Sequence, residues 1–201
     1  QAAVSWMRTN ATRLGIDHER IMASDLHIHL PQGAIKKDGP SAGVALTCAV
    51  VSAFTGRKVR NDIAMTGEVN LRGAALPVGG INEKVEGFFR SCELLGLDGS
   101  QGVLIPRRNR RHLMLGPKVV QAVEQGRFHL YTAEHAGEGM ELLTGLRFGE
   151  LGAQGYPGDT VLGRAQRTLQ AYRRACEGVE ARKPMRGLRA SHAHRPEPRR
   201  R

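Results

Sequence analysis

The chain has 201 residues, a length that suits one domain with an appendage, and it contains no run of about 18 apolar residues that would cross a membrane. Its net charge of +11 is uneven, because 12 Lys and Arg stand against 4 Asp and Glu from residue 151 onward, whereas residues 1–150 carry 18 against 15. The body therefore has an ordinary globular surface, and the basic tail is either a solvated, disordered segment or an arm for nucleic acid or another acidic partner.

The first half of the chain mixes helical and extended patterns. Apolar residues recur at helical spacing over residues 3–14, and the alternation in "DLHIHL" predicts a strand at 25–30. After a loop rich in glycine and proline, residues 43–55 are apolar almost all round, which is typical of a helix inside a core. We expect two short strands joined by a turn at 62–69 and 72–78.

The second half alternates helices with short apolar strands. The predicted elements are, in chain order, a helix over 79–97 with Gly96 as its stop, a strand at 102–106, a helix near 117–125, a strand at 128–133, a helix near 139–146 and an amphipathic helix near 162–179. This alternation is too irregular for a clean doubly wound sheet, so we expect the α+β class. Beyond the last helix the composition predicts disorder.

The stretch "KDGPSAG" (37–43) puts a serine at the opening of the first buried helix. Pro40 suits the first helical position, and Ser41 then lies in the first turn, where backbone N–H groups lack partners at the positive end of the helix dipole. Such donors could hold an oxyanion, and they would come from Ser41 and from Asp38 or Gly39, because proline has no N–H. The alternative is an ordinary turn and helix start.

A lysine follows on the apolar face of a later helix. The apolar positions there are Ile81, Val85, Phe88, Cys92 and Leu95. Lys84 falls on the same stripe, so it either extends outward or is buried for a purpose. An amine with an ordinary pKa of about 10.4 is not a base at neutral pH, but full burial lowers a lysine pKa by about 3–5. A neutral Lys84 could then take the proton from Ser41, as in known Ser–Lys pairs.

Three ordered motifs, "KDGPSAG", "MTGEVNLRG" and "LPVGGINEK", closely resemble the proteolytic domain of Lon proteases, in their LonA form, and the resemblance runs from about residue 5 to 146. It implies an ATP-dependent serine protease that degrades unfolded or damaged proteins, with Ser41 as nucleophile and Lys84 as general base. It also implies a ribosomal protein S5 domain 2-like α+β fold, assembled as a homohexameric ring with AAA+ ATPase modules. The pair requires Ser41 Oγ and Lys84 Nζ to lie about 2.6–3.2 Å apart, or further without substrate.

Further positions match the family's motifs and carry over as supporting residues. The resemblance implies that Thr66 orients the lysine, that Glu68 is tied to activity and that Asp38 gates or shapes the loop before the serine. A strand filler, an exposed carboxylate and a turn residue are their ordinary alternatives. His27 and His29 share one strand face, where groove or packing roles are expected. No third ligand has telling spacing, so we expect no metal.

The resemblance also sets the expected domain organisation. We expect a proteolytic domain over 1–148 that lacks the family's first strands, and a basic tail over 149–201 that is largely disordered with one helix. The chain has no G-x-x-x-x-G-K-[ST] phosphate loop. It should therefore hold no nucleotide itself, and ATP and Mg²⁺ would serve an ATPase module supplied in cis or in trans.

The compartment is predicted from the cysteines and from short signature stretches. Cys48, Cys92 and Cys176 are an odd set without disulfide spacing, and no secretory signal opens the chain, which favours free thiols in a reducing intracellular compartment. "SWMRTNA" and "VLIPRRN" favour the peroxisomal Lon branch, although the chain ends in "PRRR" and not in an S-K-L-type signal. Mitochondrial and bacterial origins stay open.

Two other functions fit parts of the same sequence. A proteolytically silent Lon-like fragment would serve as an assembly scaffold. A Lon-like nucleic-acid-binding domain would use the basic tail, but the related domains of that type lack the serine and lysine. The intact motifs around Ser41 and Lys84 therefore favour the protease.

Overall fold

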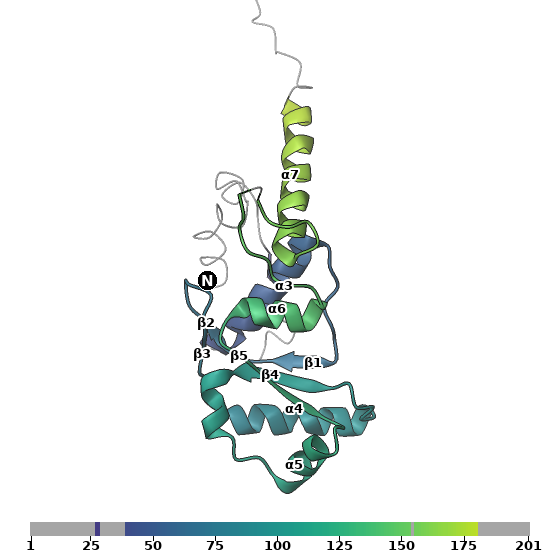
Figure 1. Ribbon diagram of the computed structural model, residues 1–201. Helices are drawn as coiled ribbons and strands as arrows, with labels where there is room; N and C mark the ends of the chain where they lie inside the picture. Colours follow the sequence, from purple (N-terminus) through teal and green to yellow (C-terminus); the bar gives the residue numbers. More distant parts are fainter. Residues whose placement is uncertain (1–26, 29–38, 154, 181–201) are drawn as a thin grey trace, which may run out of the picture.

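A computed structural model describes residues 27–28, 39–153 and 155–180 (Figure 1). Its elements are η1 (Pro40–Ala42), α3 (Gly43–Thr55), β1 (Ile63–Met65), β2 (Glu68–Val69), β3 (Ala75–Leu76), α4 (Ile81–Leu95), β4 (Gly102–Pro106), η2 (Arg107–His112), α5 (Pro117–Glu124), β5 (His129–Ala133), α6 (Ala136–Thr144) and α7 (Val161–Glu180). The predicted helix at 3–14, most of the strand at 25–30 and the tail after residue 180 lie outside the described residues.

The main sheet of the described residues has three parallel strands in the order β1-β4-β5. Its register aligns Gly102 of β4 with Ile63 of β1 and with His129 of β5. Parallel neighbours need crossover connections, and α4 and α5 supply them on one face of the sheet, while α3 and α6 cover the other face (Figure 1). The described residues confirm a mixed α and β fold, and their parallel sheet is a feature that the expected α+β class does not specify.

The central strand β4 joins two hydrophobic clusters. All five of its residues are buried, and its side chains alternate between the faces of the sheet. Leu104 packs with Val44 and Cys48 of α3. Val103 and Ile105 belong to the opposite cluster, whose other buried members are Ile81, Val85, Phe89, Cys92, Val119, Ala122 and Phe128. A strand buried on both faces is apolar throughout, which explains why "GVLIP" was predictable from its composition.

The strand predicted at 62–69 is divided between two sheets. β1 ends at Met65, and β2 pairs instead with β3 in an antiparallel hairpin that aligns Glu68 with Leu76. Gly67 lies against α3, where an added Cβ would come within 2.8 Å of a methyl group of Val44. The Gly67 carbonyl also accepts a hydrogen bond of 3.0 Å from the Val44 amide. The chain therefore leaves the main sheet here to bind the start of α3.

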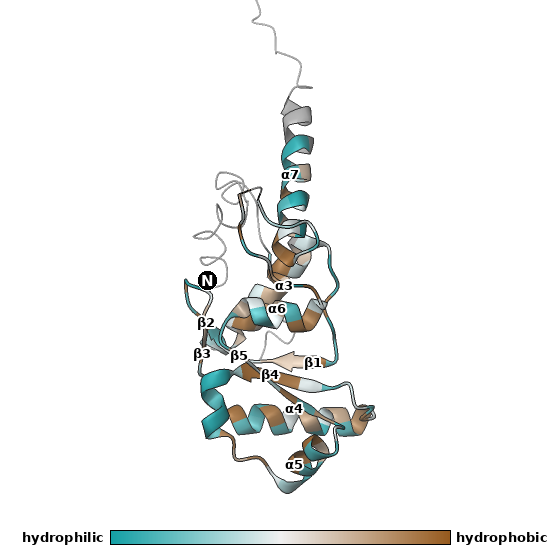
Figure 2. Cartoon of the chain, viewed as in Figure 1, coloured by the Kyte–Doolittle hydropathy of each residue, from teal (hydrophilic) through white to brown (hydrophobic). Residues whose placement is uncertain are grey.

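The last two helices differ from their predictions in informative ways. α6 begins at Ala136, earlier than predicted, because the Nδ1 atom of His135 accepts a hydrogen bond from the Gly137 amide and caps the helix. α7 confirms the predicted helix near 162–179, and its first residues pack against α3, with Val161 buried in that cluster. Figure 2 shows hydrophobic residues at the start of α7 and mainly hydrophilic ones further along.

Two cysteines have the surroundings that the sequence predicted. Cys48 and Cys92 are buried and unbridged, and burial raises the pKa of the Cys48 thiol to about 12. This thiol therefore stays protonated and acts as a small apolar side chain of the core. Among the described helices none is both long and apolar enough to cross a bilayer.

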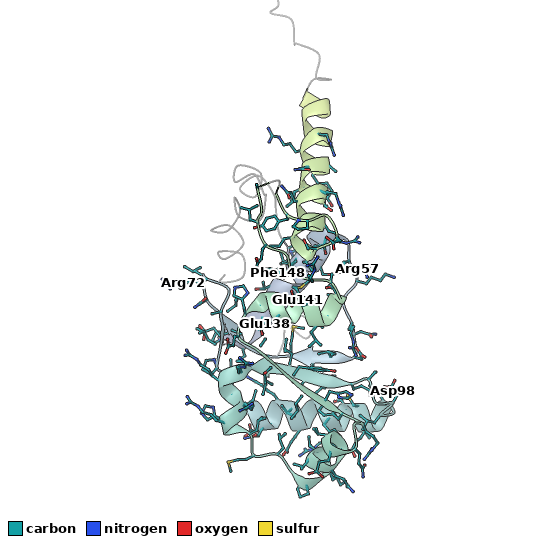
Figure 3. All side chains as sticks on the ribbon, viewed as in Figure 1. Arg57, Arg72, Asp98, Glu138, Glu141 and Phe148 are labelled. Atoms are coloured by element: carbon teal, nitrogen blue, oxygen red, sulfur yellow. The ribbon has the colours of Figure 1, made fainter. Side chains whose placement is uncertain are left out.

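An ion pair marks the edge of the sheet where β1 and β4 begin. The Arg60 guanidinium donates to both carboxylate oxygens of Asp62, at 2.9 and 2.7 Å, and to the Ser100 carbonyl at 3.0 Å. The hydrogen bonds from Arg60 lower the pKa of Asp62 to about 2. Neighbouring Asp98 lies on the right side of the molecule in Figure 3, and Arg72 of the β2–β3 turn lies on the left.

Replacing Phe128 by alanine should strongly destabilise the chain. Phe128 is fully buried, and its ring meets that of Phe89 edge to face at a centroid distance of 5.2 Å. We expect the free energy of unfolding to fall by about 3–5 kcal/mol, measured by urea denaturation. Tyr172→Ala, at a 56% exposed aromatic of α7, is the control. Equal losses in the two variants would contradict the packing described here.

The Asp62→Asn variant should alter the acid dependence of stability. The pKa of Asp62 is lower in the folded chain than in the unfolded one, so its contribution is present above about pH 4 and is lost as the pH falls toward 2. Urea midpoints measured between pH 6 and pH 2 should show a gap between parent and variant that closes toward pH 2. Glu150→Gln controls for the change in net charge, and a gap independent of pH would refute this assignment.

Candidate active site

Ser41 lies in a short 3₁₀ turn, η1, that runs directly into α3. The turn opens after Gly39, whose φ of +116° is a conformation that favours glycine. Gly43 allows the hairpin to approach, since an added Cβ would lie 2.7 Å from the Val69 amide nitrogen. The Ser41 carbonyl accepts a hydrogen bond of 2.9 Å from the Gly67 amide. The serine is thus held, half-buried, between the start of α3 and the chain that follows β1.

Lys84 reaches this serine from the first turn of α4. Its Nζ atom lies 3.1 Å from Ser41 Oγ and 2.9 Å from the Gly79 carbonyl oxygen. The two side chains are 43 residues apart in sequence, and their separation lies within the range that a nucleophile and its base require. The structure therefore brings together the two residues that the motifs singled out.

Lys84 is intermediate between the two alternatives that the sequence left open, an outward-extending and a buried side chain. Ile81, Val85 and Phe89 are buried beneath α4, whereas Lys84 is half-buried at the margin of this stripe. A residue in the first turn of a helix lies beside the chain that enters it, so its amine meets the Gly79 carbonyl and the serine in place of apolar side chains alone. The loop 29–38, which leads to the serine, lies outside the described residues.

Thr66 hydrogen-bonds to the backbone of the serine turn. It is buried at the point where the chain leaves β1, and its amide donates to the Leu104 carbonyl at 3.1 Å. Its hydroxyl donates to the Ser41 carbonyl at 3.3 Å. The resemblance implied that this threonine orients the lysine, but in the structure it supports the turn that carries Ser41.

The remaining predicted residues fall into two groups. Glu68 is half-buried at the start of β2, which packs against η1 and α3, and His27 is exposed. Asp38 and His29 lie outside the described residues, so their predicted roles remain predictions. Within the described ranges no three His, Cys, Asp or Glu side chains are grouped to hold a metal ion.

One partner of the lysine was not found from the sequence. The Gly79 carbonyl is a backbone group in the Gly-Gly turn before α4, where Gly80 adopts a left-handed φ of +65°. A backbone acceptor leaves no side-chain signal. Only the pair of glycines hinted that the chain turns sharply enough to direct a carbonyl back at the helix.

The arrangement suits transfer of a proton from a hydroxyl to an amine. With the Gly79 carbonyl accepting an N–H of a neutral Lys84, the lone pair of the amine is free to accept from Ser41 Oγ. Ser41 would then attack an electrophilic carbon while Lys84 holds the proton. This is the chemistry of acyl transfer by a Ser–Lys pair.

Comparison with known proteins supplies the family. Residues 1–143 match the protein family described as Lon protease (S16) C-terminal proteolytic domain. The Lon protease of Methylocella silvestris is 54% identical over 111 residues, covering 55% of this chain and 13% of that protein. Lon protease 2 of Herpetosiphon aurantiacus is 47% identical over 121 residues, covering 60% and 14%. The Lon protease of Desulfatibacillum aliphaticivorans is 45% identical over 141 residues, covering 70% and 16%.

These relatives are bacterial proteins, so they give no support to the peroxisomal branch that two short stretches favoured. "SWMRTNA" and "VLIPRRN" are too short to distinguish branches of a family that shares the same core. The chain matches only a small part of the length of each relative. The family match, by contrast, covers most of the chain and includes both Ser41 and Lys84. The chain therefore belongs to the family of Lon protease (S16) C-terminal proteolytic domains.

Proposed function

We propose that this chain is the proteolytic domain of an ATP-dependent serine endopeptidase, with Ser41 as the nucleophile and Lys84 as the general base. The observation that carries this proposal is the 3.1 Å separation between Ser41 Oγ and Lys84 Nζ. Family membership supports it independently, because the relatives are named Lon proteases and both residues lie within the matched range.

The reaction begins with neutral Lys84 taking the proton of the Ser41 hydroxyl as Oγ attacks the peptide carbonyl carbon. The tetrahedral intermediate collapses when the protonated Lys84 gives its proton to the departing amine, which leaves Ser41 as an ester of the acyl half. Lys84 then takes a proton from water, and the resulting hydroxide attacks the ester. The second collapse returns a proton to Ser41 Oγ and releases the carboxylic acid.

Charge that develops on the carbonyl oxygen needs donors near Ser41. The serine is in the first turn of a run of helix that starts at η1 and continues as α3, where backbone N–H groups point away from the helix. We assign the oxyanion donors to the amides of Ser41 and Gly39, with Asp38 as the neighbouring donor in the loop. Pro40 contributes none.

The family name supports a larger assembly as part of this proposal. Unfolded or damaged proteins are the substrates we propose, delivered by an AAA+ ATPase module in a homohexameric ring. ATP and Mg²⁺ would act in that module, because this sequence has no phosphate loop, and no step of the hydrolysis above passes through them. The basic tail is the part of this chain suited to nucleic-acid binding.

Removing either member of the pair should abolish peptide hydrolysis. With a fluorogenic peptide, Ser41→Ala should reduce turnover to background, and Lys84→Met should lower kcat by about 10²–10⁴-fold, the usual contribution of a general base.

Matched controls separate this chemistry from folding. Ser91→Ala removes an exposed serine of α4, and Lys118→Met removes an exposed lysine from the first turn of α5. Both should retain parental rates. Full activity in Lys84→Met would exclude it as the base. No turnover by the parent, with or without an ATPase module, would favour the silent scaffold.

Thr66→Val should weaken catalysis without removing it. The change keeps the shape of the side chain but deletes the hydroxyl that donates to the Ser41 carbonyl. One such hydrogen bond corresponds to about a 3- to 10-fold lower kcat. Thr66→Ser keeps the hydroxyl and should stay near the parental kcat in the same peptide assay. A threonine that acts only by filling the core would give the opposite order.

A further inference from the structure

Asn109 is a buried amide in an otherwise exposed, arginine-rich turn. Its side chain is 1% exposed, whereas Arg108 and Arg110 on either side are exposed. Both ends of the amide bind the backbone of one residue: Oδ1 accepts from the Val78 amide at 3.0 Å, and Nδ2 donates to the Val78 carbonyl at 2.9 Å. The side-chain amide therefore forms two hydrogen bonds with the backbone of Val78, as a neighbouring β-strand would.

Val78, which Asn109 binds, directly precedes the residue whose carbonyl accepts from Lys84. Gly79 follows Val78, and its oxygen accepts from Lys84 Nζ at 2.9 Å. Gly79 and Gly80 have no side chains to hold them in place, and an added Cβ would meet no atom within 4 Å at Gly79 and only the Glu83 carboxylate, at 3.7 Å, at Gly80. The direction of the Gly79 carbonyl thus depends on how the flanking chain is held. Asn109 holds one side, and the first turn of α4 holds the other through Lys84 N and Gly80 O at 3.1 Å.

We propose that Asn109 is a positioning residue for hydrolysis at Ser41 and Lys84, acting through Val78 and the Gly79 carbonyl. This role rests on the proposed function of the pair. Asn109 fixes the acceptor for one N–H of the amine, and that bond directs the amine's lone pair at Ser41 Oγ. Without the two hydrogen bonds from Asn109, the backbone of Gly79 and Gly80 can rotate, and the Lys84 amine loses the Gly79 carbonyl as a partner.

The structure supplies a matched control in Asn82. Its amide links the first turn of α4 to the end of η2 and the chain that follows, donating to the His112 carbonyl at 3.2 Å and accepting from the Met114 amide at 2.7 Å. It binds the same two regions of the fold by the same chemistry. Its partners lie on the far side of η2 and not in the segment 78–80, so its loss should loosen the fold without redirecting the Gly79 carbonyl.

The first test compares Asn109→Ala with Asn82→Ala in the full 201-residue chain, using a fluorogenic peptide. We expect Asn109→Ala to lower kcat by about 10- to 100-fold, as a misdirected catalytic group does, with KM nearly unchanged. Asn82→Ala should keep kcat within about threefold, even where its melting temperature falls equally. Equal losses of kcat at equal stability would overturn the positioning role.

A second test asks whether the effect passes through the lysine. In a Lys84→Met background there is no amine to direct, so adding Asn109→Ala should cause little further loss of residual turnover. A residue that only stabilises the fold would lower the rate by the same factor in both backgrounds. Additive losses would therefore overturn the proposal.

A third measurement does not depend on activity. Hydrogen exchange followed by NMR should show slow exchange of the Val78 amide in the parent chain. The exchange rate should be unchanged in Asn82→Ala and faster in Asn109→Ala. An unprotected Val78 amide in the parent would contradict the hydrogen bond from this amide to Asn109. Activity that survives Ser41→Ala would overturn the proposed function instead, and with it this role, while leaving the exchange result intact.

Discussion

Burial of β4 on both faces is the constraint on which the rest of the structure depends. Val103 and Ile105 pack toward α4 and α5, and Leu104 packs toward α3 and α6, so one short strand holds both layers of helices together. Its neighbours β1 and β5 run parallel to it, and their carboxyl ends therefore meet at one edge of the sheet. Thr66 follows β1 and Asn109 follows β4 at that edge, which makes it the natural position for a site.

The Ser41–Lys84 contact spans the two layers. Ser41 precedes α3, whose residues Val44 and Cys48 pack on one face of the sheet. Lys84 opens α4, whose residues Ile81 and Val85 pack on the other. The two first turns meet beyond the sheet's edge, so their separation depends on the register of every layer between them. This explains why each side of the contact has its own backbone anchor, with Thr66 on the serine turn and the Gly79 carbonyl on the amine.

The amine of Lys84 has polar neighbours. The sequence left open whether Lys84 extends outward or lies in an apolar pocket, and the structure places its half-buried amine beside a hydroxyl and a carbonyl. These two polar groups orient the Lys84 amine, whereas apolar side chains would exclude water from it.

The sequence alone determined most elements of the described fold and the chemical identity of the site. Apolar runs such as "GVLIP" and the helical stripe of α4 have a period that local sequence reveals, and the motifs around Ser41 and Lys84 identified the family. Only the tertiary structure decided what surrounds them. The division of residues 62–69 at Gly67 depends on a contact with Val44. The start of α6 depends on one ring nitrogen of His135, and the hydrogen bond from Thr66 depends on its position near η1. The Gly79 carbonyl and its link to Asn109 join groups far apart in the chain through the backbone, and backbone atoms are the same in every residue, so no pattern of side chains announces them.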